Sequence, residues 1–445
     1  METTDITILG GGWAGLLSAY FINKMSPKLN ILILEKDEKS KGGLLNSEEI
    51  NGYIFDTAGP HILFSKNTET LTSIVDILGD NVQVIERKSF VLFEGTKVPY
   101  PFENGIFVLP AELRFQIGLE LVNSLIRLNS DKNWRPTNFN DWIYGFFGNY
   151  IGEKYLEPYN RKIWKTDPKE MDADWVFQPG RVPLPILDDI LRSVAGLKSI
   201  GYKEQQHFFY PKEGGILSLY LSLREKVISQ GVQIRNGVEV KSLQKIKSVW
   251  SVNSKFNSSV IISTLPLIQL PNILKFSRDK ANLFRQLRYN RVIVIGFIIN
   301  SNAPDEQVLY VPDKTIIFHR ITWMSNLTGK HEPGRSNLIA EITVPMDEKI
   351  DCNEIYSETV YGLTKIGIIK STDDIIFSKC WVNEFGYPIY SLNHSTHRNT
   401  INETLKQIGI YSVGRWGSWH YWNTDKVYEA AKKLAAEVIP ELEKH

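Results

Sequence analysis

Short apolar runs broken by a glycine turn organise the beginning of the chain. Residues Ile6–Leu9 form an apolar run that predicts a buried strand, and Gly10–Gly12 then break it. Apolar side chains recur at helical spacing over Trp13–Met25, and a second apolar run follows at Ile31–Leu34. A strand, a glycine turn, a helix and a second strand form a βαβ unit, so we expect a parallel sheet here.

The rest of the chain alternates between helical and strand-like patterns. Residues from about Asn133 to Leu197 are rich in aromatic side chains and mostly helical in pattern, with frequent prolines. A long helix, roughly Asp425–Glu443, ends the sequence. Strand-like apolar runs lie between these segments at Val232–Val240, Val260–Ser263, Val292–Ile299 and Asn337–Val344.

Composition narrows the class of protein. The chain has 445 residues, which favours two domains, and its 51 basic and 50 acidic residues give a formal net charge of +1. That balance argues against a nucleic-acid partner, which usually requires a strong basic excess. Cys352 and Cys380 are too few for a disulfide framework or a thiolate zinc site, so we expect a reducing compartment and no metal. The sequence has no apolar leader and no run of about 18 apolar residues, so we expect a cytoplasmic protein with no membrane span.

The glycine turn carries the first candidate chemistry. Gly10, Gly12 and Gly15 form a G-x-G-x-x-G motif between a predicted strand and a predicted helix. The first glycine permits the tight turn, the second lets a pyrophosphate approach the backbone, and the third allows close packing of the helix on the strand. Glu35 ends the second strand, where a carboxylate can bind a ribose hydroxyl. The motif predicts a dinucleotide site, whose further members would be Trp13, Ala14 and Lys36.

Further loops favour FAD over NAD as the dinucleotide. A second glycine loop follows Glu35, and a glycine-proline turn ending in a histidine follows that loop. In these features the chain resembles the superfamily of flavin-dependent amine oxidases and mutases, in which FAD lies extended along such loops. The residues concerned are Gly42, Gly43 and Leu44 in the first loop and Gly59, Pro60 and His61 in the second.

A single βαβ unit cannot complete its own sheet, so later strands must return to it. We therefore predict an α/β fold with a Rossmann-type FAD-binding domain over residues 1–85, completed by residues 205–272 and 405–445. A mainly helical substrate region over residues 86–204 and an antiparallel-sheet substrate domain over residues 273–404 would be inserted between those pieces.

Within that superfamily the chain resembles the UDP-galactopyranose mutase family, especially its longer eukaryotic-type branch. The matching strings keep the same order over almost the whole chain, which makes the resemblance specific. They include Val98–Asn104, Pro158–Trp164, Tyr210–Gly215, Phe318–Arg320, Gly386–Pro388 and Gly414–Tyr421. The resemblance implies a redox-neutral reaction in which FAD, active when reduced, forms an N5–sugar adduct, and the pyranose and furanose forms of a nucleotide sugar interconvert. It also implies a reductant such as NAD(P)H and a role in cell-surface polysaccharide biosynthesis.

The resemblance assigns roles to individual residues. Arg181 and Arg320 would clamp the diphosphate, because a guanidinium is always charged and can bind two phosphate oxygens at once. His61 would lie on the loop that faces the flavin ring, and Arg87 would add a positive charge near it. The residues that would bind substrate are Tyr100, Phe102, Glu103, Asn104, Tyr159, Asn160, Trp164, Tyr310, Tyr387 and Tyr421. The remaining contacts to FAD would come from Val240, Gly414, Arg415, Asn423 and Thr424.

Two positions depart from the family pattern. Glu103 stands where the family has a glutamine that helps to recognise uracil, and a carboxylate only accepts hydrogen bonds. It would suit a base that presents N–H groups, such as guanine or the amine of cytosine, unless it is a solvated side chain beside a shifted base. Leu327 stands where the eukaryotic-type pattern has a tyrosine, so one phosphate-binding hydroxyl is missing or comes from elsewhere. The sugar, the base and the oligomeric state stay open.

Two other functions also stay open. An FAD-dependent oxidoreductase of the amine oxidase or protoporphyrinogen oxidase type would use the same cofactor domain. It would need an amine-binding or apolar channel in place of two diphosphate-clamping arginines. A non-catalytic nucleotide-binding scaffold would keep the glycine turn and tolerate the loss of Arg181 and Arg320.

Overall fold

The first strand lies inside a sheet that later segments of the chain complete. In the computed structural model, which describes residues 2–39, 41–177, 186–199, 206–330 and 332–442, β1 (Glu2–Leu9) pairs in parallel with β2 (Ile31–Leu34) and β12 (Phe256–Ser263). The strand order is β10-β11-β12-β1-β2-β9, and β18 also pairs with β12. The other strands of this sheet are β9 (Gln233–Arg235), β10 (Leu243–Ile246), β11 (Val249–Val252) and β18 (Ile410–Ser412). This sheet confirms the prediction that later strands return to the first βαβ unit.

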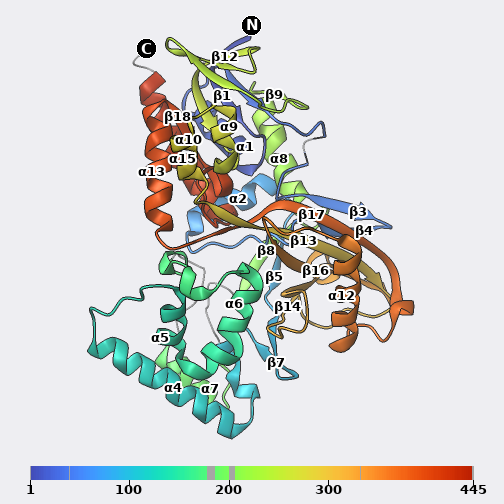
Figure 1. The fold of residues 1–445 in the computed structure, drawn as a ribbon. Helices are drawn as coiled ribbons and strands as arrows, with labels where there is room; N and C mark the ends of the chain where they lie inside the picture. Colours follow the sequence, from blue (N-terminus) through green and yellow to red (C-terminus); the bar gives the residue numbers. More distant parts are fainter. Residues whose placement is uncertain (1, 40, 178–185, 200–205, 331, 443–445) are drawn as a thin grey trace.

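Helices from both ends of the chain pack beside this sheet (Figure 1). Helix α1 (Trp13–Met25) contacts α8 (Leu217–Ser229) and α15 (Thr424–Leu442), and the rings of Phe21 and Tyr428 meet edge to face at 4.9 Å. The predicted bounds of the first helix and the second strand are confirmed. The strand predicted over Val232–Val240 is wrong beyond Arg235, because the N–H of Val238 bonds to the carbonyl of Glu35 outside the strand ladder.

A second seven-stranded sheet forms the other half of the fold. Its order is β17-β13-β16-β15-β14-β6-β7, and most neighbours are antiparallel, although β14 and β6 are parallel. Helix α12 (Cys352–Lys365) covers one face, where Tyr356 stacks on Phe297 with ring centres 6.0 Å apart. The strands are β6 (Ser89–Phe93), β7 (Thr96–Pro99), β13 (Arg288–Ile299), β14 (Val308–Tyr310), β15 (Arg320–Trp323), β16 (Ser336–Pro345) and β17 (Ile375–Ile389). Strands β6 and β7 fall within the range predicted to be mainly helical, yet they extend this sheet.

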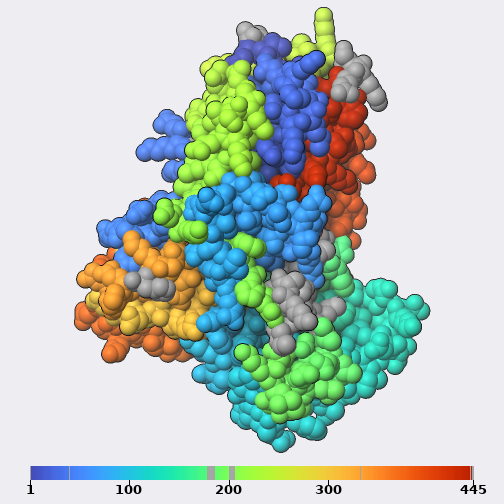
Figure 2. Space-filling model, turned by 180° about the vertical axis from the view of Figure 1, so that it is seen from behind, coloured from blue at the N-terminus to red at the C-terminus, as the bar shows by residue number. Residues whose placement is uncertain are grey.

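The helices between β7 and β8 (His207–Tyr210) form a third part, at the bottom of Figure 1. Its core is aromatic, with Phe139, Trp142 and Phe147 all buried. Its main helices are α4 (Ala111–Ser130), α5 (Phe139–Ile151), α6 (Glu157–Trp164) and α7 (Leu187–Val194). Seen from behind, the blue segment that follows the first βαβ unit lies between this part and the parallel-sheet part (Figure 2). No helix in the described ranges is both long and apolar enough to cross a bilayer.

The remaining elements are short. Strands β3 (Ser47–Ile50) and β4 (Tyr53–Asp56) form a hairpin, and β5 (Gln83–Glu86) pairs with β8. The other α-helices are α2 (Thr68–Leu78), α3 (Phe102–Gly105), α9 (Leu270–Ile273), α10 (Arg278–Phe284), α11 (Met324–Thr328), α13 (His394–Gln407) and α14 (Gly414–Gly417).

Asp56 fixes the start of the loop that leads to Gly59. Its fully buried carboxylate accepts hydrogen bonds from the hydroxyls of Ser47 and Tyr210, both at 2.7 Å, and from the N–H of Ile216 at 3.3 Å. Burial raises the pKa of Asp56 from 3.8 to about 6, and the nearby charge of Glu341 acts in the same direction. The three hydrogen bonds oppose this shift without cancelling it.

Asp56→Asn should make the stability of the protein less dependent on pH. The folded-state pKa of Asp56 lies above the unfolded value, so its contribution is present below about pH 3.8 and is lost as the pH rises through about 6. The variant lacks this loss, which corresponds to roughly 3 kcal/mol for a shift of about two pKa units. Urea unfolding between about pH 4 and 7 measures the difference. Asp80→Asn, at an exposed position, is the control, and identical pH profiles for Asp56→Asn and wild type would contradict the prediction.

Candidate active site

The glycine turn between β1 and α1 leaves one side open. Gly10 has a φ of +96°, and a Cβ on Gly15 would lie 2.0 Å from the carbonyl oxygen of Gly10, so both positions require glycine. A Cβ on Gly12 would meet nothing within 4 Å. No side chain caps the start of α1, so N–H groups of its first turn are available on this open side. The turn fits a pyrophosphate, as the motif predicts.

Glu35 reaches the same turn from the end of β2. Its Oε2 accepts a hydrogen bond from the N–H of Gly11 at 2.7 Å, and its Oε1 accepts one from the N–H of Asp37 at 2.9 Å. The carboxylate is fixed beside the pyrophosphate position, where a ribose hydroxyl can donate to it. The neighbouring Lys36 is exposed.

The second glycine loop, like the first, has one glycine that faces open space and one that packs tightly. Gly42 and Gly43 have φ of +76° and +62°, and a Cβ on Gly43 would meet nothing within 4 Å, whereas one on Gly42 would strike the carbonyl of Leu45. Leu44 and Val240, which follows β9, pack against the same apolar cluster.

The C-terminal segment closes the site from the opposite side. Gly414 has a φ of +95°, and a Cβ there would lie 2.6 Å from the Cβ of Ala14 in α1. The indole N–H of Trp13 donates to the carbonyl of Thr424 at 3.2 Å. Arg415 donates to the carbonyl of Trp422 at 2.9 and 2.8 Å. Residues 414–424 therefore lie against the start of α1, beside the candidate dinucleotide site.

A cavity of about 190 Å³ lies beside these loops, and we call it the flavin cavity. It brings together residues predicted to contact FAD and residues predicted to bind substrate. Asn383 of β17 also lines it and donates to the carbonyl of Thr57 at 2.8 Å, which fixes the glycine-proline loop. The predicted residues on its wall are Leu44, Gly59, Pro60, His61, Arg87, Tyr100, Tyr310, Arg320, Tyr387, Arg415, Tyr421, Asn423 and Thr424.

Three neighbouring strands place Arg320 at this cavity. Tyr310 in β14, Arg320 in β15 and Glu341 in β16 pair directly across the sheet. Arg320 donates to both carboxylate oxygens of Glu341, at 2.6 Å from Nε and 2.5 Å from Nη2. Burial alone would lower the pKa of Arg320, but the carboxylate of Glu341 holds it well above the ordinary value. A Cβ on Gly59 would lie 2.6 Å from Oε2 of Glu341, so only glycine lets the loop approach this pair.

His61 and Arg87 differ in charge. Burial and the positive charges of Arg415 and Arg320 lower the pKa of His61 to about 3, so His61 is neutral at physiological pH. Arg87 lies over the rings of Phe64 and Phe208, at 5.3 and 5.8 Å from their centres. Its Nε and Nη2 are buried and have no hydrogen-bond partner among the described residues. This unpaired guanidinium on the cavity wall suits an anionic group.

A second cavity of about 200 Å³ adjoins the flavin cavity, and we call it the substrate cavity. Five residues line both cavities and form a shared wall: Tyr100, Tyr310, Arg320, Tyr387 and Tyr421. Tyr387 and Tyr421 meet edge to face at 5.1 Å, and Trp164 contacts both rings. Burial raises the pKa values of Tyr100, Tyr159 and Tyr387 above the ordinary value, so these phenols stay protonated and can donate hydrogen bonds.

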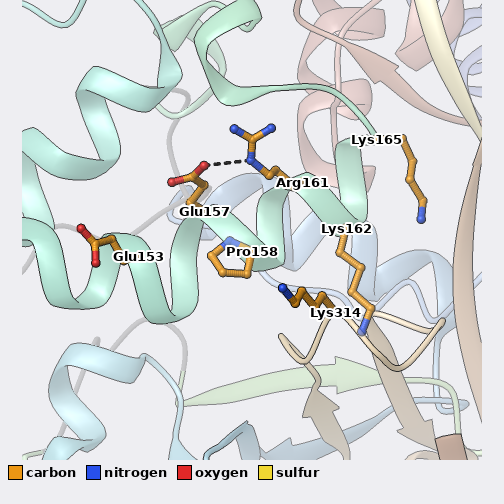
Figure 3. Close-up of a pocket in the computed structure, with 7 residues that line it drawn as sticks. All are labelled: Glu153, Glu157, Pro158, Arg161, Lys162, Lys165 and Lys314. Carbon is orange, nitrogen blue, oxygen red and sulfur yellow. Dashed lines mark hydrogen bonds and ion pairs between the residues drawn. The ribbon is translucent and has the colours of Figure 1, made fainter.

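Lys162 holds α6 against the antiparallel sheet. Its buried ammonium donates to the carbonyls of Val311 and Asp313, both at 2.8 Å, just after Tyr310. Burial lowers the pKa of Lys162 to about 7. Figure 3 shows this outer face of α6, where Lys162 points towards the segment of Lys314 and Arg161 pairs with Glu157 at 2.8 Å. The opposite face of α6 carries Tyr159, Asn160 and Trp164 into the substrate cavity.

The structure distributes the predicted substrate-binding residues unevenly. Asn160 donates to the carbonyl of Leu156 and accepts from the indole of Trp164 at 3.1 Å, so its amide already orients Trp164. Asn104 lies away from the cavity and donates to Ser199 at 3.2 Å, in the segment after α7. Leu327 is buried in the core, and Arg181 lies outside the described residues. The predicted residues that line the substrate cavity are Tyr100, Phe102, Glu103, Tyr159, Asn160, Trp164, Tyr310, Arg320, Tyr387 and Tyr421.

Several residues of the site were not predicted. Tyr155, Trp175 and His319 line the substrate cavity, and Glu341 lies behind Arg320. His319 stands next to Arg320 and Trp175 stands in the aromatic helical segment, so their positions gave a signal. Glu341 gave none, because its role depends on the register of two strands.

Comparisons with known proteins agree on the cofactor. A domain described as an NAD(P)-binding Rossmann-like domain matches residues 8–78. The chain is similar to a structure of reduced UDP-galactopyranose mutase, with a TM-score of 0.87 and 25% identity, covering 99% of this chain and 94% of the other. It also shares its fold with putrescine oxidase, with a TM-score of 0.66 and 14% identity, covering 98% of this chain and 99% of the other. The matching domain and these flavoenzymes support FAD as the cofactor.

The curated relatives are similar over shorter stretches. Coproporphyrinogen III oxidase from Staphylococcus aureus is 23% identical over 260 residues, 54% of this chain and 55% of that protein. An uncharacterised protein from Methanothermococcus thermolithotrophicus is 41% identical over 71 residues, 16% of this chain and 65% of that protein. The chain thus spans less than two thirds of either relative, and the names in these comparisons do not agree on one reaction.

Gly15→Ala should lower the stability of the protein, whereas Gly12→Ala should weaken the binding of FAD. Gly15→Ala drives a Cβ into the backbone of Gly10 and should lower the free energy of unfolding by roughly 1–3 kcal/mol. Gly12→Ala should fold normally but bind FAD about tenfold more weakly, since its Cβ enters the side open to the pyrophosphate. Urea unfolding and FAD titration of the apoprotein measure the two effects. Equal FAD affinity in Gly12→Ala and wild type would contradict the assignment of the open side.

Arg320→Met should destabilise the protein more than Glu341→Gln. The first change leaves a carboxylate with no exposed surface unpaired, which costs about 3–5 kcal/mol. The second leaves an arginine whose side chain is 22% exposed at the cavity. The double variant should be more stable than Arg320→Met alone, because neither charge remains. Urea unfolding of all three tests this order, and a more stable Arg320→Met than Glu341→Gln would refute it.

Proposed function

We propose that this enzyme of the FAD-dependent amine oxidase superfamily is a nucleotide-sugar mutase that interconverts pyranose and furanose forms of its substrate. The observation that carries the proposal is the shared wall of Arg320 and four tyrosines between the flavin cavity and the substrate cavity. A permanent cation surrounded by phenol hydroxyls suits a diphosphate at this border, and the rings exclude water. The likeness of almost the whole chain to UDP-galactopyranose mutase supports the same conclusion.

The residues of the shared wall would bind the leaving diphosphate. Arg320 uses two N–H groups for Glu341, and a guanidinium has five, so others remain for phosphate oxygens. Tyr387 and Tyr421 would add phenol donors, and Arg181 would be the second arginine of the clamp. His61, which is neutral, would lie beside the flavin without adding a charge there. Reduced FAD would supply a nucleophilic N5 and return without net electron transfer to the substrate.

Glu103 bears on the nucleobase. Its side chain is buried on the wall of the substrate cavity, beside Tyr155 and Phe102. A carboxylate accepts hydrogen bonds only, so a base that presents N–H groups, such as guanine or the amine of cytosine, would suit it. Competition binding of UDP, GDP, CDP and dTDP would rank the bases.

A net oxidation is the main alternative reaction, since coproporphyrinogen III oxidase is among the relatives. A cationic amine would meet repulsion from Arg87 and Arg415 on the wall of the flavin cavity, where Glu341 already balances the charge of Arg320. A cytoplasmic location and NAD(P)H as reductant remain parts of the proposal.

The reduced enzyme should interconvert pyranose and furanose forms, and the oxidised enzyme should not. Dithionite-reduced protein is screened anaerobically with UDP-galactopyranose and other nucleotide sugars, and chromatography reads the exchange. Arg320→Lys should lower kcat/KM about 10- to 100-fold, because lysine loses the planar fork for phosphate.

Lys314→Ala is the matched control, since it removes a cation from the turn after β14, which faces the outer side of α6 away from the substrate cavity (Figure 3). Its kcat/KM should equal that of wild type. Stoichiometric hydrogen peroxide coupled to oxidation of the substrate would refute a mutase and favour the oxidoreductase.

A further inference from the structure

His319 is a buried histidine whose hydrogen-bonding capacity is unused. It lies immediately before β15, next to Arg320, and only 2% of its surface is exposed. Its N–H donates to the carbonyl of Glu341 at 3.0 Å, and its carbonyl accepts from the N–H of Val311 at 2.9 Å, so the backbone is fixed on both sides. The imidazole Nδ1 is shielded and has no hydrogen-bond partner in the described part of the chain. The imidazole therefore has no structural hydrogen bond to account for its burial.

The ring of His319 lies on the wall of the substrate cavity. It meets the ring of Tyr159 with centres 6.5 Å apart and the ring of Tyr387 with centres 6.3 Å apart. Because Nδ1 is the shielded nitrogen, Nε2 is the one that can reach a molecule in the cavity. Two aromatic rings and a fixed backbone hold this nitrogen in place.

The surroundings of His319 keep it uncharged. Burial and the positive charges of Arg320, Lys162 and Lys165 lower the pKa of His319 well below its ordinary value. A neutral imidazole offers one donor and one acceptor, whereas an imidazolium offers two donors. Since only Nε2 reaches the cavity, it donates in one tautomer and accepts in the other. A hydroxyl, which both donates and accepts, can pair with either tautomer, whereas a phosphate oxygen can pair only with the donating one.

Other buried histidines have evident structural partners. His394 stacks on Tyr390 with ring centres 4.0 Å apart and hydrogen-bonds to the backbone of Trp419, and it lies outside both cavities. The Nδ1 of His420 lies 3.0 Å from the hydroxyl of Tyr390. His319 differs from both, because its ring faces a cavity instead of a partner side chain.

We propose that His319 is a specificity-determining residue that hydrogen-bonds to a hydroxyl of the sugar in the substrate cavity. This inference rests on the proposed nucleotide-sugar substrate. Arg320 and the tyrosines of the shared wall bind the diphosphate, and the neutral imidazole beside them reads the hydroxylated part of the same molecule. His319 then contributes to the affinity for the nucleotide sugar and nothing to that for the nucleoside diphosphate.

The test compares ligands with and without the sugar. Dissociation constants are measured for UDP-galactopyranose against UDP and for GDP-mannose against GDP, on wild type, His319→Phe and His319→Gln. The advantage that the sugar gives is the dissociation constant of the nucleoside diphosphate divided by that of its nucleotide sugar. For the pair in which wild type shows the larger advantage, His319→Phe should reduce it about three- to tenfold, which corresponds to the loss of one hydrogen bond. Affinity for the nucleoside diphosphate should stay within about twofold. His319→Gln, which keeps a donor and an acceptor, should recover part of the loss.

His394→Phe is the matched control, because it replaces another buried neutral histidine away from the cavities and should leave the advantage unchanged. FAD content and thermal unfolding report whether each variant is folded. An unchanged advantage in His319→Phe, or an equal loss of nucleoside diphosphate affinity, would overturn the inference. So would a wild-type enzyme that binds neither nucleotide sugar better than its diphosphate.

The proposed function is tested separately, by measuring pyranose–furanose exchange with the reduced wild type. Wild type without exchange, combined with a sugar-dependent loss of binding in His319→Phe, would refute the mutase and keep the sugar contact. Exchange in wild type, combined with the same affinity for the nucleotide sugar in His319→Phe as in wild type, would keep the mutase and refute the sugar contact.

Discussion

The ion pair between Arg320 and Glu341 sets the geometry at the centre of the molecule. Glu341 has no exposed surface, so its charge is tolerable only while Arg320 holds both of its oxygens. The pair in turn fixes Tyr310 on the neighbouring strand, and the loop at Gly59 can approach it only because that residue has no side chain. Because Glu341 balances the charge of Arg320, the net positive charge around the flavin cavity comes from Arg87 and Arg415.

Burial keeps the histidines and tyrosines of the site uncharged, and the nearby cations act in the same direction on the two histidines. His61 and His319 have lowered pKa values, and Tyr159 and Tyr387 have raised ones, so all four are neutral near pH 7. The positive charge of the cavities thus comes from arginines, which do not titrate, while direction-specific hydrogen bonds come from neutral groups. This division suits a ligand that combines an anionic part with an uncharged polar part.

The sequence predicted the parts of the structure that depend on local pattern. The first βαβ unit followed from apolar period and glycine spacing, and the bounds of α1 and β2 agree with the prediction. The strand predicted beyond Arg235 was wrong, and the addition of β6 and β7 to the second sheet was missed, because both depend on which distant strand is available as a partner. The same holds in the site: His61 and Arg320 stand in recognisable strings, whereas Glu341 and Asn383 matter only through register and a long-range hydrogen bond.

The central position of β1 also has a consequence for the synthesis of the chain. The βαβ unit leaves the ribosome well before β12, so one edge of β1 has no partner until β12 has been made. The hydrogen bond from Trp13 to Thr424 spans 411 positions, so this contact forms only after the start of α15 has been made. Through most of translation the nascent chain therefore carries an apolar strand with an open edge, which makes it a natural client for chaperones.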